Sequence, residues 1–221
     1  MAKVIYILGQ ARCGSTVVGF ALGNHKGFRN LGETSSWIWG RTWPETSDGK
    51  PFVFNLTCEP RERVWIDSSK SLWRLGQWLR SKHDVRVIWL KRNLWQCIQS
   101  RVKRNPPYSS RLKLYLTPVF IRACNYIYLK ARRVSYVSVN LDDLRDNNKA
   151  VKEQIECFVG EKLPNLYKDC DVTTQHVITG NHRTVGQRIL RLCWQPAFTD
   201  ADIEATKRAL SRTSQHPSKE G

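Results

Sequence analysis

A short apolar strand that runs straight into a glycine-framed loop constrains this chain more than any other feature. Residues 3–8 (KVIYIL) are apolar and rich in β-branched residues, and they are followed by residues 9–16 (GQARCGST) and by a helical pattern over 15–23. The loop has the Gly-x-x-x-x-Gly frame, in which backbone N–H groups and a helix N-terminus converge on an anion. This order of strand, loop and helix predicts an anion site within an α/β fold.

Short strand-like runs alternate with longer helical stretches along the rest of the chain. Apolar, β-branched runs predict strands at 64–66, 85–90 and 135–139, and 28–31 can form another. Apolar periodicity predicts helices at 15–23, 72–81, 94–103, 112–132 and 150–158. We therefore expect a P-loop NTPase-like α/β fold of three layers, with a mainly parallel central sheet flanked by helices and ligands at the carboxyl ends of the strands.

Composition limits the domain number and the kind of partner. The 221 residues predict one domain over 1–210 and a flexible polar tail over 211–221. An apolar content of 41%, with nine Trp, excludes a disordered chain. The formal charge of +17 implies a partner that carries phosphate, sulfate, nucleic acid or an anionic surface.

The cysteine pattern and the lack of a long apolar run indicate the compartment. Seven Cys are scattered without a C-x-x-C pair, so we expect free thiols in a reducing environment. No apolar run approaches the length of a membrane span, and no signal-peptide pattern follows Met1. We expect a cytoplasmic protein without a membrane anchor or a membrane partner.

The loop lacks the lysine that an NTPase requires. Ser15 stands after Gly14 where a P-loop NTPase has the Lys that reaches the terminal phosphates, and the nearest cation is Arg12. A triphosphate concentrates negative charge that Mg²⁺ and that Lys share. A sulfonate carries less charge, so one loop cation and neighbouring hydroxyls can suffice without a metal. A turn that binds nothing, or a degenerate NTPase loop, is the alternative interpretation.

The segment 11–16 (ARCGST) resembles the 5′-phosphosulfate loop of the sulfotransferases, whose donor is 3′-phosphoadenosine 5′-phosphosulfate (PAPS). That family's loop has a Lys or Arg, any residue, a Gly and two hydroxyl residues. The sequence matches it at each place: Arg12, Cys13, Gly14, Ser15 and Thr16. The resemblance implies PAPS as donor, 3′-phosphoadenosine 5′-phosphate (PAP) as product and no required metal.

A second pair matches the anchor that sulfotransferases use for the 3′-phosphate. Arg92 follows the strand 85–90, and Ser100 stands eight residues later on the next helix. The family has an Arg and a Ser at this spacing, and a guanidinium offers phosphate a planar fork of donors. A solvated basic helix is the alternative.

Two weaker matches extend the resemblance. Residues 67–70 (DSSK) resemble a D-x-S-K signature of the family, which implies that Lys70 stabilises the charge on the leaving oxygen. Lys70 is otherwise a surface lysine. Residues 176–183 (HVITGNHR) resemble the loop that closes over the donor in bacterial members, which implies donor contacts from Gly180, Asn181 and Arg183.

Sulfonate transfer to a hydroxyl also needs a base, and Glu33 is the leading candidate. It follows the segment 28–31 and stands 21 residues after Arg12, a separation like that in tyrosylprotein sulfotransferases. The catalytic set is then Glu33, Lys70 and Arg12. Glu33 could instead begin a helix; the reserve candidates are Glu59, Glu62 and His25.

The leading hypothesis is a PAPS-dependent sulfotransferase acting on a hydroxyl-bearing, anionic acceptor, which could be a carbohydrate, a peptide tyrosine or a small molecule. The first alternative is a P-loop kinase or NTPase, for which Asp67 is the candidate Mg²⁺ ligand. The second is a basic nucleic-acid-binding module. No specific nucleic acid is expected as a partner of the enzyme.

Overall fold

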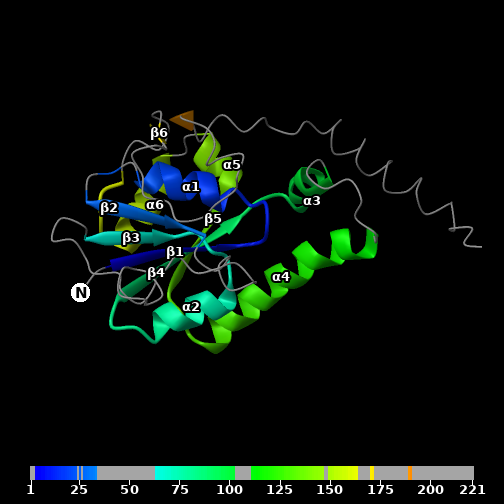
Figure 1. Ribbon diagram of the computed structural model, residues 1–221, viewed down its shortest axis with the longest axis horizontal. Coiled ribbons are helices and arrows are strands. Elements are labelled where there is room, and N and C mark those ends of the chain that lie inside the picture. Colours follow the sequence, from blue (N-terminus) through cyan, green and yellow to red (C-terminus); the bar gives the residue numbers. More distant parts are fainter. Residues whose placement is uncertain are drawn as a thin grey trace, which may run out of the picture.

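A five-stranded parallel sheet forms the centre of the computed structural model (Figure 1). The strands lie in the order β2-β3-β1-β4-β5, and every neighbouring pair is parallel. Their bounds are β1 Lys3–Gly9, β2 Phe28–Gly32, β3 Val64–Asp67, β4 Asp84–Lys91 and β5 Tyr136–Asn140. The structure describes residues 3–23, 25, 27–33, 63–102, 111–146, 149–163, 170–171 and 189–190.

Helices cover both faces of this sheet. Their bounds are α1 Ser15–Gly23, α2 Leu72–Leu79, α3 Leu94–Val102, α4 Arg111–Ala131, α5 Leu141–Arg145 and α6 Lys149–Val159. Figure 1 shows α1, α5 and α6 on one side of the sheet, and α2 and α4 on the other. Two short strands, β6 Cys170–Asp171 and β7 Ile189–Leu190, form a separate antiparallel pair. No helix within the described ranges has both the length and the apolar character needed to cross a membrane.

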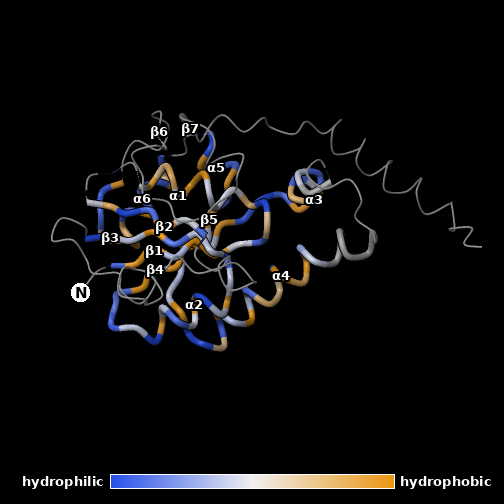
Figure 2. Tube along the Cα trace, in the orientation of Figure 1, coloured by the Kyte–Doolittle hydropathy of each residue, from blue (hydrophilic) through white to orange (hydrophobic). Residues whose placement is uncertain are grey.

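The side chains of β1 alternate between two separate cores. Ile5 and Ile7 belong to a buried cluster with α1, α5 and α6, whereas Tyr6 and Leu8 belong to a cluster with α2 and α4. Figure 2 shows hydrophobic residues along the central strands and along α1. A strand buried on both faces is apolar at successive positions rather than at alternate ones. This explains the run KVIYIL.

The expected α/β fold with a parallel sheet and flanking helices is confirmed. Helix α5 was not expected, because it has only five residues and begins directly where β5 ends, so no loop signal separates the two. The strand pair β6 and β7 was also missed, since two residues are too few to show a period. The predicted tail over 211–221 lies outside the described residues.

The second glycine of the loop after β1 packs against α5. Gly14 has a φ of 92°, and a Cβ placed there would lie 2.6 Å from Cδ2 of Leu141. An L-residue is therefore disfavoured at Gly14 both by its backbone conformation and by the space around it.

Replacing Gly14 by Ala should lower the free energy of unfolding by roughly 2–4 kcal/mol, through the left-handed backbone and the overlap with Leu141. Urea denaturation measures this change. Gly19→Ala is the matched control, because the nearest atom to a Cβ there is 3.4 Å away and α1 gains a better helix former. Its stability should stay within about 1 kcal/mol of the parent. Equal midpoints for the two variants would contradict the packing described here.

Candidate functional site

The loop between β1 and α1 lies at the carboxyl end of the central strand, where open α/β sheets bind their ligands. Arg12 and Gly14 both adopt left-handed backbone conformations, with φ of 72° and 92°. The loop leads into the N-terminus of α1, where Ser15 and Thr16 are buried. A turned backbone ahead of a helix N-terminus is an arrangement suited to an anion. A left-handed conformation is costly for Arg12, since it is not a glycine.

The two anion anchors expected from the sequence meet in the structure. Arg12 Nε donates a hydrogen bond of 2.9 Å to Ser100 Oγ in α3. Arg92, at the end of β4, donates from Nη1 to the carbonyl oxygen of Arg12 at 3.1 Å. The strand order places β4 beside β1, so these residues lie at one edge of the sheet although 80 or more positions separate them in the chain.

Arg92 is held from several sides. Its Nε donates to Gln96 Oε1 at 3.0 Å, and its carbonyl oxygen accepts from Gln10 Nε2 at 3.2 Å and from Arg122 Nη2 at 2.6 Å. The residue is only 5% exposed, and burial lowers the pKa of Arg92 from its ordinary value. The lowered pKa reflects the cost of keeping a cation away from water, which a bound anion would offset.

Glu33, Thr16 and Lys70 form a second cluster from three different elements. Thr16 Oγ1 in α1 donates to Glu33 Oε1 at 2.7 Å, and Lys70 Nζ lies 2.5 Å from the same oxygen. Glu33 follows β2 and Lys70 lies three residues beyond β3, so both are at carboxyl ends of strands. The side chains of the ion pair are about one-fifth exposed. A carboxylate, an ammonium and a hydroxyl thus stand together beside the loop.

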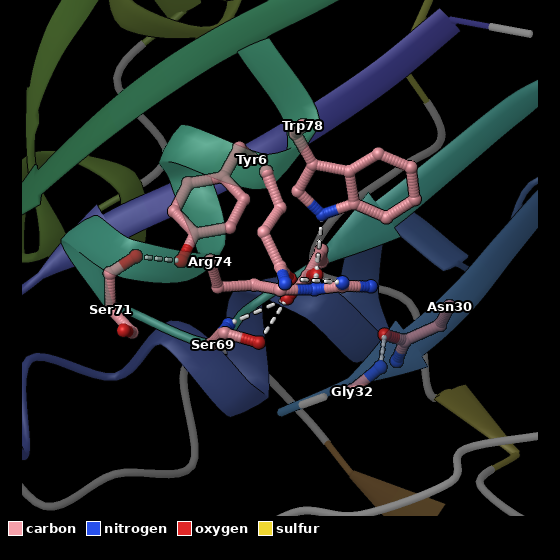
Figure 3. Close-up of polar contacts among 9 residues, drawn as sticks. Tyr6, Asn30, Gly32, Ser69, Ser71, Arg74 and Trp78 are labelled. Carbon is pink, nitrogen blue, oxygen red and sulfur yellow. Dashed lines mark hydrogen bonds and ion pairs between the residues drawn. The ribbon is translucent and has the colours of Figure 1, made fainter. Parts of the chain in front are cut away.

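Asp67 does not stand free for a metal ion. It is fully buried, and its carboxylate accepts hydrogen bonds from the Ser69 backbone N–H at 2.9 Å and from Trp78 Nε1 at 2.7 Å. Arg74 Nε lies 3.3 Å from Oδ2. Figure 3 shows Ser69, Arg74 and Trp78 close together. The sequence reading missed this network, although the i, i+4 spacing of Arg74 and Trp78 on α2 was a visible signal.

Of the remaining candidates, the structure describes only His25. Glu59, Glu62, Gly180, Asn181 and Arg183 lie outside the described residues. His25 precedes β2, so it lies near the amino ends of the strands, where its ring packs against Phe28 at 4.6 Å. The reserve role of His25 as a base is therefore not supported by its position.

Two cysteines are buried next to the loop. Burial raises the pKa of Cys13 and raises that of Cys97 to about 11. Gln10 Nε2 donates to Cys97 Sγ at 3.5 Å. Within the described part of the chain Cys13, Cys97, Cys124 and Cys157 are free thiols, as expected. Both side chains are buried, and the raised pKa values disfavour the thiolate form that a nucleophile requires.

Alkylation by iodoacetamide at pH 8 should separate these cysteines. With a pKa of about 11, roughly 10⁻³ of Cys97 is thiolate at that pH, and the residue is also buried. Cys157 is exposed and should react at least about 100-fold faster in the folded protein. Peptide-level mass spectrometry reads each site. Modification of Cys97 at the rate of Cys157 would contradict the burial of Cys97 in α3.

Three solved structures that superpose on this chain are described as sulfotransferases or sulfotransferase domains. The sulfotransferase domain of the Synechococcus PCC 7002 olefin synthase superposes with a TM-score of 0.57 at 17% identity, over 99% of this chain and 97% of that one. The sulfotransferase domain from the curacin biosynthetic pathway gives 0.55 at 14% identity, over 99% of each chain. A sulfotransferase from Alicyclobacillus acidocaldarius gives 0.50 at 14% identity, over 76% of this chain and 86% of that one.

These likenesses concern the fold. No family model and no curated protein matches the sequence. At 14–17% identity, structural similarity establishes a shared architecture. The resemblance to sulfotransferases is thereby confirmed at the level of the fold, and the chemistry depends on the site residues themselves.

Proposed function

We propose that this chain is a sulfotransferase that moves a sulfonate group from PAPS to an acceptor hydroxyl. The observation that carries the proposal is the junction between two anion-binding segments, in which Arg12 bonds Ser100 and Arg92 holds the Arg12 carbonyl oxygen. Two anchors at one sheet edge suit a donor that carries anionic groups at both its 5′ and 3′ positions. The fold shared with sulfotransferase domains supports the same conclusion.

The residues present fit such a donor. The turned loop 12–16 ends at the N-terminus of α1 and offers backbone N–H groups, two hydroxyls and one guanidinium. Arg92, whose pKa is lowered by burial, would gain from a phosphate partner. We assign the 5′-phosphosulfate to the loop residues Arg12, Cys13, Gly14, Ser15 and Thr16. We assign the 3′-phosphate to Arg92 and Ser100.

Glu33 and Lys70 supply the chemistry on the protein side. The donor provides an activated sulfonate when bound. Glu33 accepts the acceptor's hydroxyl proton while the acceptor oxygen bonds to sulfur and the bond from sulfur to the 5′-phosphate oxygen breaks. Lys70 and Arg12 offset the negative charge that the phosphate oxygen gains. Thr16 orients the Glu33 carboxylate by its hydrogen bond of 2.7 Å.

The alternatives have less support. A P-loop kinase needs a lysine where Ser15 stands and an acidic ligand for Mg²⁺, and the Asp67 carboxylate is occupied by Ser69, Arg74 and Trp78. A basic nucleic-acid module needs no ordered phosphate loop. The charge of +17 exceeds what the donor anchors use, which supports an anionic acceptor such as a sulfated carbohydrate or an acidic peptide.

Isothermal calorimetry with PAP tests the donor site. Arg12→Ala and Arg92→Ala should each weaken PAP binding roughly 10- to 100-fold, because each removes charge-assisted hydrogen bonds to phosphate. Arg86→Ala is the control on the same strand: Arg86 pairs with Asp84 at 3.0 Å at the amino end of β4. Its PAP affinity should stay within about twofold of the parent. Unchanged binding in both site variants would overturn the proposed function.

Turnover with a hydroxyl acceptor tests the base. Glu33→Gln should lower kcat by roughly 10² to 10⁴ and leave PAP affinity nearly unchanged, since the amide cannot take the proton. The parent's activity should persist in EDTA, whereas that of a P-loop kinase would be lost.

The matched control for the base is Glu161→Gln. This variant also breaks an ion pair with a lysine, in which Lys3 Nζ lies 2.9 Å from Glu161 Oε1. Lys3 is at the amino end of β1, away from the loop. This variant should keep full turnover. Parent-like kcat in Glu33→Gln would move the role of base to another residue.

A further inference from the structure

We propose that Asp67 is a positioning residue that fixes the backbone at Ser69, directly before Lys70, and so places the lysine amine against Glu33. The inference rests on the proposed function, in which Lys70 stabilises the leaving oxygen. The Asp67 carboxylate contacts Ser69, Arg74 and Trp78, and Ser69 directly precedes Lys70 in the chain. Its effect on the reaction therefore passes through Lys70.

The backbone of Lys70 needs external support. Its φ is 64°, in the left-handed region that costs a residue with a Cβ roughly 1–2 kcal/mol. Such a conformation persists only where surrounding contacts determine it, and it is frequent at functional sites. Lys70 lies in the connection between β3 and α2, where neither strand nor helix hydrogen bonds impose it.

Hydrogen bonds hold the residues on either side of Lys70. On one side, the Asp67 carboxylate accepts from both the backbone N–H and the hydroxyl of Ser69. On the other side, Tyr6 Oη donates to the Ser71 carbonyl oxygen at 2.7 Å. Figure 3 shows these contacts on Ser69 and Ser71. Burial raises the pKa of Tyr6 well above its ordinary value, so its hydroxyl keeps the proton that it donates.

Two side chains of α2 hold the Asp67 carboxylate in place. Trp78 Nε1 donates to Oδ2 at 2.7 Å, and Arg74 Nε lies 3.3 Å from the same oxygen. The Arg74 guanidinium also lies 4.7 Å from the centre of the Trp78 ring. All three side chains are buried, with exposed fractions of 0%, 5% and 6% for Asp67, Arg74 and Trp78. These contacts hold the carboxylate in one orientation. Its hydrogen bonds to Ser69 then fix the turn at that residue.

The turn decides where the lysine amine lies. Lys70 Nζ lies 2.5 Å from Glu33 Oε1, and Thr16 Oγ1 donates to that oxygen as well. A change of φ at Lys70 would swing its side chain away from this pair. Loss of the Asp67 contacts should therefore release the amine before it disturbs the phosphate loop, whose own contacts come from Arg92 and Ser100.

Acetylation of lysines by acetic anhydride tests the placement without any substrate. In Asp67→Asn, the Lys70 amine should react roughly 2- to 5-fold faster than in the parent, the factor expected for losing an ion pair of this exposure. Tyr6→Phe removes only the hydroxyl that holds Ser71 and should act in the same direction. Ser81→Ala is the control, because its hydroxyl donates to Trp78 O at 2.6 Å at the far end of α2. It should leave Lys70 unchanged.

A double-mutant cycle separates positioning from general destabilisation. Asp67→Asn should lower kcat roughly tenfold in the parent, with PAP affinity unchanged, and should lower it no further in a Lys70→Ala background. Urea midpoints show that the variants compared are folded. If Asp67→Asn does not fold, Ser69→Ala, which loses the hydroxyl bond to Asp67, takes its place in both experiments.

The outcomes are distinct. Two results would overturn the proposal. The first is unchanged acetylation of Lys70 in the folded variants. The second is that Asp67→Asn lowers kcat by the same factor in the Lys70→Ala background as in the parent. Faster acetylation of Lys70 in a protein whose parent form binds no PAP would support the placement by Asp67 and defeat the sulfotransferase function instead.

Discussion

The candidate site depends on the reciprocal hydrogen bonds between the loop after β1 and the end of β4. Gln10 in the loop donates to the Arg92 carbonyl oxygen, and the Arg92 guanidinium donates to the Arg12 carbonyl oxygen. Each segment therefore satisfies a backbone acceptor of the other. The first bond is buried and the second is partly buried, so an unmatched partner would cost much of the desolvation of a polar group. The loop is consequently tied to the strand that also carries the second anion anchor.

The rest of the site extends this arrangement across the sheet edge. The ion pair of Glu33 and Lys70 joins the ends of β2 and β3, and Thr16 connects it to the first turn of α1. Charges of both signs are thus held within a few ångströms at the carboxyl ends of the strands. A preorganised set of this kind stabilises charge without moving at the moment of reaction. That property is what transfer of a sulfonate demands.

The regular elements were predictable because their signals are local. The run KVIYIL, which is buried on both faces, can be recognised from a few consecutive residues. The same holds for the periodic stretch that forms α4 Arg111–Ala131. Helix α5 was not predictable, since five residues following β5 directly carry no period. The network around Asp67 was missed for a different reason. Its partners come from β1, the turn and α2, and only packing brings them together.

By itself, the sequence determined the anion loop, the lack of an NTPase lysine at Ser15 and the candidates Arg12, Arg92, Ser100 and Glu33. The loop and the missing lysine follow from residue type and spacing, whereas the four candidates follow from the resemblance of these motifs to those of sulfotransferases. Only the tertiary structure decided that Arg12 meets Ser100, that Glu33 pairs with Lys70 and that the Asp67 carboxylate bonds to the turn at Ser69. The physical reason is the strand order β2-β3-β1-β4-β5, which gathers at one edge groups that are distant in the chain.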